Sequence, residues 1–125
     1  MNPTAMRAIL LISVITTALR VFGTIVGEYG GSMILDSLVS VTAAIALLFV
    51  IAAMTLQPWW VKALVASIVI NAVSIVYQVA LEAIGSVDYA WPTVALLPDL
   101  LLVFVPPVVA LILYKSKGVQ LPPAD

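Results

Sequence analysis

Apolar positions dominate the chain in four long runs, and the polar positions between them mark the ends of the predicted helices. The runs cover residues 5–27, 33–56, 61–84 and 92–114. Each run is long enough to cross a hydrocarbon core of about 30 Å at about 1.5 Å per residue. The pattern therefore predicts an all-α fold: an integral membrane four-helix bundle that forms a single domain over residues 1–125.

The third run carries a polar stripe that organises the prediction for the other three. Its polar side chains recur at steps of four, three, four and four residues, at Ser67, Asn71, Ser74, Gln78 and Glu82. At about 100° per residue, these positions fall within roughly an 80° arc of a helix. Lipid cannot satisfy polar groups, so we expect this face to turn into the bundle.

The first run has a face of small and polar residues, at Ser13, Thr16, Arg20, Gly23 and Gly27. Ser, Thr and Gly at this spacing are typical of close packing between membrane helices. Arg20 needs more than close packing, because a guanidinium near the middle of a bilayer requires a partner or water.

The second run begins with an acid and continues into an apolar half. Asp36 and Ser40 share a face near its start. Asp36 fits two interpretations equally: an acid stabilised by the dipole at a helix N-terminus, or a member of the polar interior. Residues 43–54 are apolar all round, and we expect them to face lipid over much of their surface.

The connecting segments predict the orientation. Glu28–Ser32 and Gly85–Trp91 are predicted turns without Lys or Arg, and the adjacent Trp59 and Trp60 are typical of a membrane interface belt. Four basic residues fall on the other side of the four-span layout, at Arg7, Lys62, Lys115 and Lys117. The positive-inside rule then predicts that both termini are cytoplasmic in a multi-pass protein of the cell membrane.

Prolines make the fourth run irregular. Pro106 and Pro107 lack amide protons and remove the helical hydrogen bonds to the carbonyls of Leu102 and Val103, which predicts a kink at this pair. The start of the helix is open, because Pro98 could also be its first helical residue.

Ionisable groups gather in the outer half of the predicted bundle. The candidates for a polar or ion site are Arg20, Asp36, Asn71, Gln78, Glu82 and Asp99. Arg20 and Asp99 both lie roughly 6 Å to the outer side of the midplane at about 1.5 Å per residue, so we expect them to pair, with Glu82 as the second choice. One Arg against three acids leaves excess negative charge, which protonation of an acid, a cation or water in an open vestibule would balance.

Composition excludes several functions. The chain is 64% hydrophobic and 9% charged, with a mean hydropathy of +1.24, so it has too few charged residues to cover a surface that faces water. A net charge of −1 gives no basis for nucleic-acid binding. Cysteine and histidine are absent, which excludes disulfides, thiol nucleophiles, iron–sulfur clusters and the usual zinc sites. We therefore expect no metal and no cofactor.

Three functions fit these features. The favoured one is a non-catalytic subunit or accessory protein of a larger membrane assembly, whose partners are the lipid bilayer and other membrane chains or itself. The second is a small homo-oligomeric transporter or channel for a proton, a cation or a polar solute. The third is a membrane enzyme that acts on a lipid-like substrate by acid–base chemistry, with Asp99, Asp36, Glu82 and Tyr77 as its residues.

The chain is similar in size alone to the small multidrug resistance transporters. Those proteins carry a membrane-embedded glutamate in the first span, where this chain has Arg20. The chain also lacks a phosphate-binding loop, a nucleophile elbow and a dinucleotide fingerprint.

Overall fold

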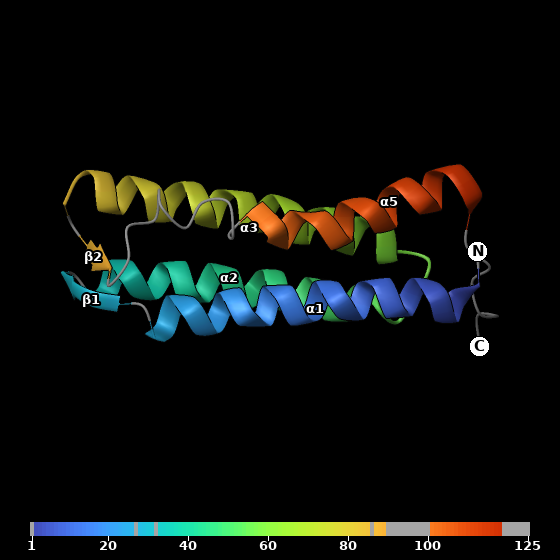
Figure 1. Ribbon diagram of the computed structural model, residues 1–125, viewed down its shortest axis with the longest axis horizontal. Helices are drawn as coiled ribbons and strands as arrows, with labels where there is room; N and C mark the ends of the chain where they lie inside the picture. The colour runs from blue at the N-terminus through green and yellow to red at the C-terminus, as the bar shows by residue number, and fades with distance from the viewer. Residues whose placement is uncertain (1, 27, 32, 86, 90–100, 119–125) are drawn as a thin grey trace.

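A computed structural model describes residues 2–26, 28–31, 33–85, 87–89 and 101–118, and the side chains of 25–36 and 87–89 lie outside that description. Within it, four α-helices lie along one long axis, and each runs antiparallel to the helices that it packs against (Figure 1). They are α1 (Pro3–Val26), α2 (Met33–Ala53), α3 (Trp60–Ala83) and α5 (Val105–Lys117). The helices agree with the predicted runs to within a few residues for the first three.

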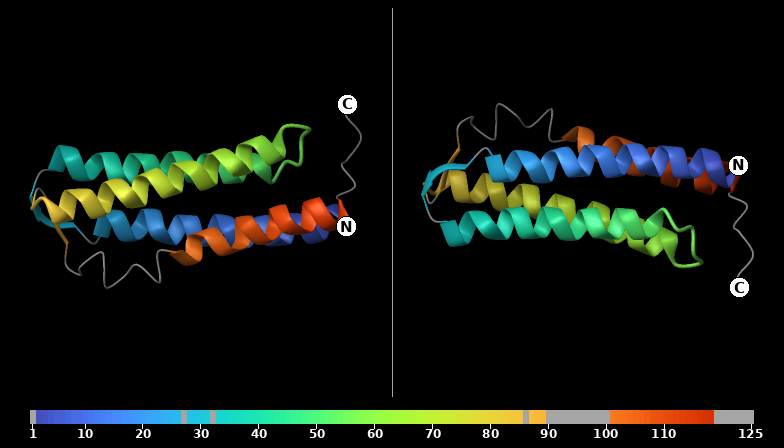
Figure 2. Two further views of the ribbon diagram at one scale, coloured as in Figure 1. Left: turned by 90° about the horizontal axis from the view of Figure 1, so that it is seen from above. Right: turned by 90° about the horizontal axis from the view of Figure 1, so that it is seen from below.

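The helices pack in a defined order. α2 contacts α1 on one side and α3 on the other, and α5 packs mainly against α1. In the two views of Figure 2, α1 and α5 form one layer, and α2 and α3 form the other. α5 and α3 contact each other much less than the other neighbouring pairs do. Among the described residues, one side of α3 is therefore left open.

The two predicted turns, which follow α1 and α3, pair with each other at one end of the bundle. β1 (Glu28–Gly31) and β2 (Val87–Tyr89) form a two-stranded antiparallel sheet with an irregularity between Glu28 and Gly30. The helical bundle brings both loops to the same end, where their backbone groups can bond to one another. The prediction of two plain turns was therefore wrong, although the helices alone build the bundle.

The break in the fourth run lies one turn before the prolines. A 3₁₀ segment, η1 (Leu102–Phe104), precedes α5, and Pro106 and Pro107 lie in the first turn of that helix. Val105 donates its backbone N–H to the carbonyl of Leu102, which Pro106 cannot serve. The predicted kink at Pro106–Pro107 is thus replaced by a 3₁₀ segment and a new helix start. Pro98 lies outside the described residues.

An apolar core occupies the end of the bundle where α1 begins and α5 ends. Its buried members are Met6, Leu10, Val50, Ala53, Leu56, Trp60, Ala63, Leu64 and Ala110. Trp60 meets Tyr114 of α5 edge-on, with ring centroids 5.1 Å apart. Trp60 is therefore a core residue and only Trp59 is exposed, which corrects the expectation that both lie in an interface belt. At this end, Arg7 donates from Nε to the carbonyl of Met54, just beyond α2.

α2 is apolar but two-sided. Along Ala43–Met54 it buries a line of small side chains at Ala43, Ala46, Val50 and Ala53, and it exposes large ones on the other side, Leu48 and Ile51 among them. The expectation that this segment faces lipid over much of its surface is therefore correct only for the large, exposed side chains. The small side chains face α3, which can approach α2 closely along them.

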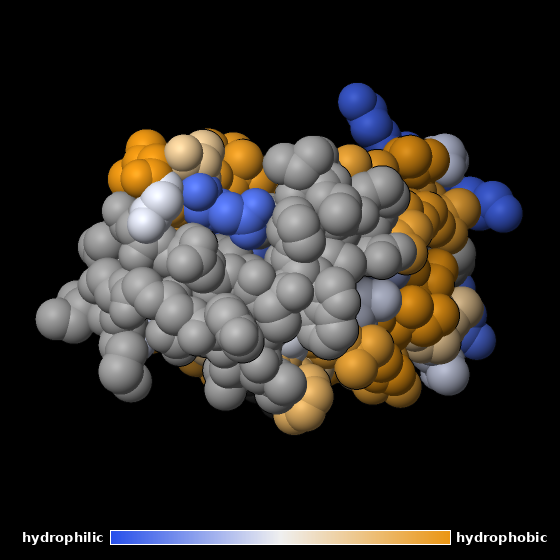
Figure 3. Space-filling view, turned by 60° about the vertical axis from the view of Figure 1, so that its left-hand side comes forward, coloured by the Kyte–Doolittle hydropathy of each residue, from blue (hydrophilic) through white to orange (hydrophobic). Residues whose placement is uncertain are grey.

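Large apolar side chains are exposed in number, and several polar side chains are buried beside the apolar core. Large apolar side chains are exposed on every helix, with Leu19, Phe22 and Leu48 each 65% exposed. Among the side chains that the structure describes, eight polar ones are buried: Ser13, Thr17, Arg20, Thr24, Ser67, Asn71, Ser74 and Gln78. Figure 3 shows the exposed apolar surface in orange. α3 and residues 3–24 of α1 are long and apolar enough to cross a membrane, a criterion that core helices and signal sequences also meet.

Candidate functional site

The polar stripe of α3 faces the interior of the bundle. Ser67, Asn71, Ser74 and Gln78 are all buried, and Glu82 at the end of the helix is half-buried. The spacing that places them on one face also places them opposite the exposed valines of the same helix. The predicted burial of the stripe is confirmed for the first four residues.

Arg20 of α1 joins this stripe. Its Nη2 donates to Ser74 Oγ at 2.9 Å and lies 3.4 Å from Gln78 Oε1, a longer contact with the next turn of α3. The guanidinium is buried, with the residue only 6% exposed. The length of the arginine side chain lets it reach across the bundle from α1 to α3, two helices that have little backbone contact with each other.

α2 contributes hydroxyl groups to the same level of the bundle. Thr42 Oγ1 lies 2.8 Å from Ser74 Oγ, and it is also within 2.9 Å of carbonyls of its own helix. Ser74 therefore connects α1, α2 and α3 at one point. Ser40 Oγ donates to Thr24 Oγ1 at 3.1 Å, and Ser67 Oγ donates to the carbonyl of Ala46 at 2.7 Å.

The buried face of α1 differs from the predicted one. The polar residues that it buries are Ser13, Thr17, Arg20 and Thr24, at steps of four, three and four. Thr16 is half-buried and donates to the carbonyl of Ser13 in its own helix. Gly23 is exposed, and an added Cβ there would meet nothing within 4 Å. The predicted seam is therefore correct at Ser13 and Arg20 and wrong by one residue at Thr16 and Gly23, where Thr17 and Thr24 are buried instead. Gly27 lies outside the described residues.

The buried face of α1 continues toward the start of the helix, and only the structure shows this, because residues 8–12 there are apolar all round. Met6 and Leu10 are both fully buried, and they continue the same four–three spacing toward the start of the helix. Thr17 and Thr24 extend that line, whereas Thr16 and Gly23 do not. Thr42 was missed for a different reason: a single threonine in an apolar run has no periodicity of its own.

The structure tests the acids only in part. Asp99 lies outside the described residues, and so does the side chain of Asp36. The pairing of Arg20 with Asp99 therefore stays a prediction. Tyr77 packs against the buried pair Val39 and Leu81 and lines a hollow on the outer side of α3. It thus faces a different side of the helix from Ser74 and Gln78.

Asn71 is the least satisfied member of the stripe. Its Oδ1 is buried, and no hydrogen-bond donor reaches it among the described residues. A buried amide oxygen of this kind is a position where a water molecule or a cation could bind. The described residues contain no group of three or more acidic side chains placed to hold a metal ion.

The chemistry of the network is mainly that of neutral donors and acceptors around one guanidinium. Hydroxyl and amide groups can fix the positions of helices and can hold water, but they supply no nucleophile without an activating base. Comparison of the chain with models of known protein families, with curated proteins and with solved structures finds no match.

Proposed function

We propose that the chain is a small non-catalytic integral membrane protein that acts as a subunit or accessory component of a larger membrane assembly. The observation that carries this proposal is the point where α1, α2 and α3 meet through Arg20, Ser74 and Thr42. Polar groups that bond to one another across helix interfaces hold the helices in register. Such a network supports a structural role for the polar interior.

Two further observations support the membrane location. Polar side chains are buried while Leu, Ile, Phe and Val cover the helices, an arrangement that is stable where the surroundings are apolar. The basic residues Arg7, Lys62, Lys115 and Lys117 belong to the helix ends opposite the small sheet. We infer from this asymmetry that both termini are cytoplasmic.

The test is purification of the tagged full-length chain from membranes in a mild detergent. We expect it to remain in the membrane fraction after a high-salt wash and to elute as a complex of fixed stoichiometry. A chain released by salt would contradict the membrane location. A monomer that elutes alone from every mild detergent would contradict the subunit role.

A second candidate, a small transporter for a proton or a cation, is favoured by Asn71. A buried, unsatisfied amide oxygen one turn from Ser74 is a position for water or a cation within the bundle. Proteoliposomes that contain a pH-sensitive or cation-sensitive dye would test it. Transport predicts flux above that of protein-free vesicles, which Asn71→Leu abolishes and Ser116→Ala preserves. An absence of flux would exclude this candidate.

A further inference from the structure

The end of the bundle where α1 begins and α5 ends carries positive charge alone among the described residues. Its basic side chains are all exposed: Arg7, Lys62, Lys115 and Lys117. Residues 2–13, 50–64 and 105–118, which make up this end, contain no Asp or Glu. The acids whose backbone the structure places belong to the opposite end: Glu28 in β1, Asp36 in the first turn of α2, Glu82 in the last turn of α3 and Asp88 in β2. We call the four basic residues the basic end.

Three of these cations each end a row of exposed apolar side chains on their own helix. The rows are Leu11, Ile15 and Phe22 behind Arg7, Val65, Val69 and Val76 behind Lys62, and Val108 and Ile112 behind Lys115. At about 100° per residue, each cation and its row fall within roughly an 80° arc. A ligand that lies along any of these helices would therefore meet a positive charge at one end and an apolar surface over the rest of its length.

Lys62 is the cation that the fold itself explains least. Lys115 and Lys117 are in the last turn of α5, where the helix macrodipole favours positive charge, and Arg7 donates to the carbonyl of Met54. Lys62 is the third residue of α3, where the macrodipole disfavours a cation, and no hydrogen bond or ion pair joins it to another described residue. A negatively charged group from outside the chain would offset that cost.

We infer that the basic end binds the head groups of anionic phospholipids in preference to those of zwitterionic phospholipids. A phospholipid supplies both features that each row requires, because its head group meets the cation and its acyl chains cover the apolar side chains. A nucleic acid or an acidic soluble protein would match the charges but would leave the apolar rows exposed to water. This inference rests on the proposed membrane location and names the class of lipid at one side of the membrane.

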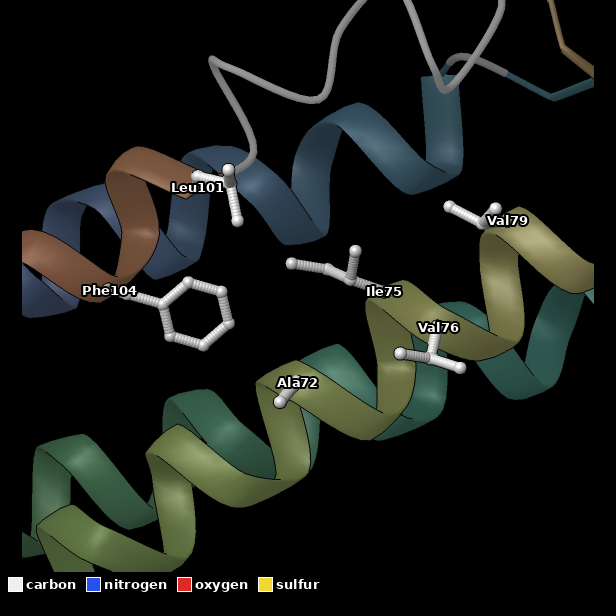
Figure 4. Close-up of a pocket in the computed structure, with 6 residues that line it drawn as sticks. All are labelled: Ala72, Ile75, Val76, Val79, Leu101 and Phe104. Atoms are coloured by element: carbon white, nitrogen blue, oxygen red, sulfur yellow. The ribbon is translucent and has the colours of Figure 1, made fainter.

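An apolar hollow beside the middle of α3 provides a contrast to the basic end. It has a volume of about 360 Å³ and is lined by Ala72, Ile75, Val76, Val79, Leu101 and Phe104 (Figure 4). None of these lining residues is charged or polar. The hollow can contact an acyl chain, but its side chains cannot distinguish one head group from another, so it supplies a control position for the same measurement.

Quenching of tryptophan fluorescence by brominated phospholipids tests the inference with the full chain in vesicles. A Trp91→Phe background leaves Trp59 and Trp60, and Trp59, 47% exposed, lies three residues before Lys62. The vesicles contain phosphatidylglycerol and phosphatidylcholine at equal mole fraction, with bromine on the acyl chains of one lipid at a time. We expect stronger quenching by the brominated phosphatidylglycerol. High salt should reduce the difference by screening.

Variants of Lys62 assign the preference to the basic end. Lys62→Gln should lower the preference for phosphatidylglycerol about fivefold, because one cation near an anionic surface contributes about that factor, and Lys62→Arg should keep it. Ser116→Ala, a neutral change at the same end, should also keep it. Equal quenching by the two lipids, or a preference that Lys62→Gln leaves unchanged, would overturn the inference and leave the membrane location standing.

The hollow separates a local preference from a general one. Val76→Trp, in a background that also carries Trp59→Phe and Trp91→Phe, places an exposed probe beside the hollow. We expect the two brominated lipids to quench this probe equally. A preference for phosphatidylglycerol as large as that at Trp59 would show a general attraction of the lipid and would overturn the assignment to the basic end. An absence of quenching by either lipid at both positions would overturn the membrane location together with this inference.

Discussion

The two halves of the bundle are held together by different chemistry. Near the start of α1, the helices meet through apolar side chains such as Leu10, Leu64 and Trp60. In the half toward the small sheet, they meet through Arg20, Ser74 and other groups that form hydrogen bonds. In a bilayer, apolar side chains gain little by leaving lipid, so the first half depends on shape. The second depends on the satisfaction of each polar group.

The two halves should also differ in the substitutions that they tolerate. Apolar contacts tolerate exchanges that conserve volume. A buried guanidinium tolerates only arrangements that supply acceptors at the right positions. We therefore expect the polar half to define the register of the helices, and the apolar half to tolerate sequence change.

The largest expected difference is in accessibility to a thiol reagent, because the two ends of the bundle should lie on opposite sides of the membrane. Tyr29→Cys and Asp88→Cys are in β1 and β2, and Ser116→Cys is in the last turn of α5. An impermeant thiol reagent applied to intact cells should label the first two and leave the third unlabelled until the membrane is opened. The reverse pattern would contradict the predicted orientation.

The next largest effect is expected from Arg20→Ala. If Arg20 forms the predicted pair with an acid, loss of this partner should cost about 3–5 kcal/mol, as for a buried ion pair, so the variant should unfold at a clearly lower temperature in detergent. Arg20→Lys is the matched control: it keeps the charge without the forked donors, and should recover only part of the loss.

The same variant tests the predicted pair. If Arg20 and Asp99 interact, Asp99→Asn added to Arg20→Ala should restore part of the stability, because the second charge is no longer left alone. Strictly additive losses in the double variant would refute the pairing. Glu82→Gln in the same background tests the second choice.

A smaller loss is expected in the apolar half. Leu10→Ala removes a fully buried side chain and leaves a cavity. In a bilayer the cavity accounts for most of the cost, so we expect about 2 kcal/mol, near the lower end of the range for soluble proteins. Leu19→Ala, at an exposed position of the same helix, is the control and should leave the unfolding temperature unchanged. Equal losses at both positions would mean that α1 is rotated relative to the structure described.

The smallest effect is expected from Ser74→Ala, which removes a hydroxyl group that connects three helices. Hydrogen bonds between membrane helices contribute about 0.6 kcal/mol on average and up to about 1.7 kcal/mol. We expect a loss near the upper value, because Arg20 and Thr42 both contact this oxygen. Ser116→Ala, which removes a bond within one exposed turn, is the control. A loss no larger than that of the control would show that the network is not cooperative.

The periodicity of polar residues along the sequence was sufficient to predict which face of α3 is buried. The stripe of α3 could be assigned to the interior from spacing once the helix was expected to lie in a bilayer, where four polar side chains on one arc have no other stable position. The bounds of α1, α2 and α3 follow from the lengths of the apolar runs and the Gly and Pro residues between them. These features depend on residues that are close together in the sequence, so the sequence pattern predicts them.

Other features required the contacts between helices. Thr16 and Thr17 are adjacent and chemically alike, and only the packing of α1 against α2 decides which one is buried. Trp59 and Trp60 are identical in type, yet only Trp60 is in the core, because α5 brings Tyr114 to its edge. The pairing of β1 with β2 joins segments that lie more than fifty residues apart. The sequence shows which residues can be buried or paired. The helices and strands that pack beside them select among equivalent residues, and those contacts exist only once the chain has folded.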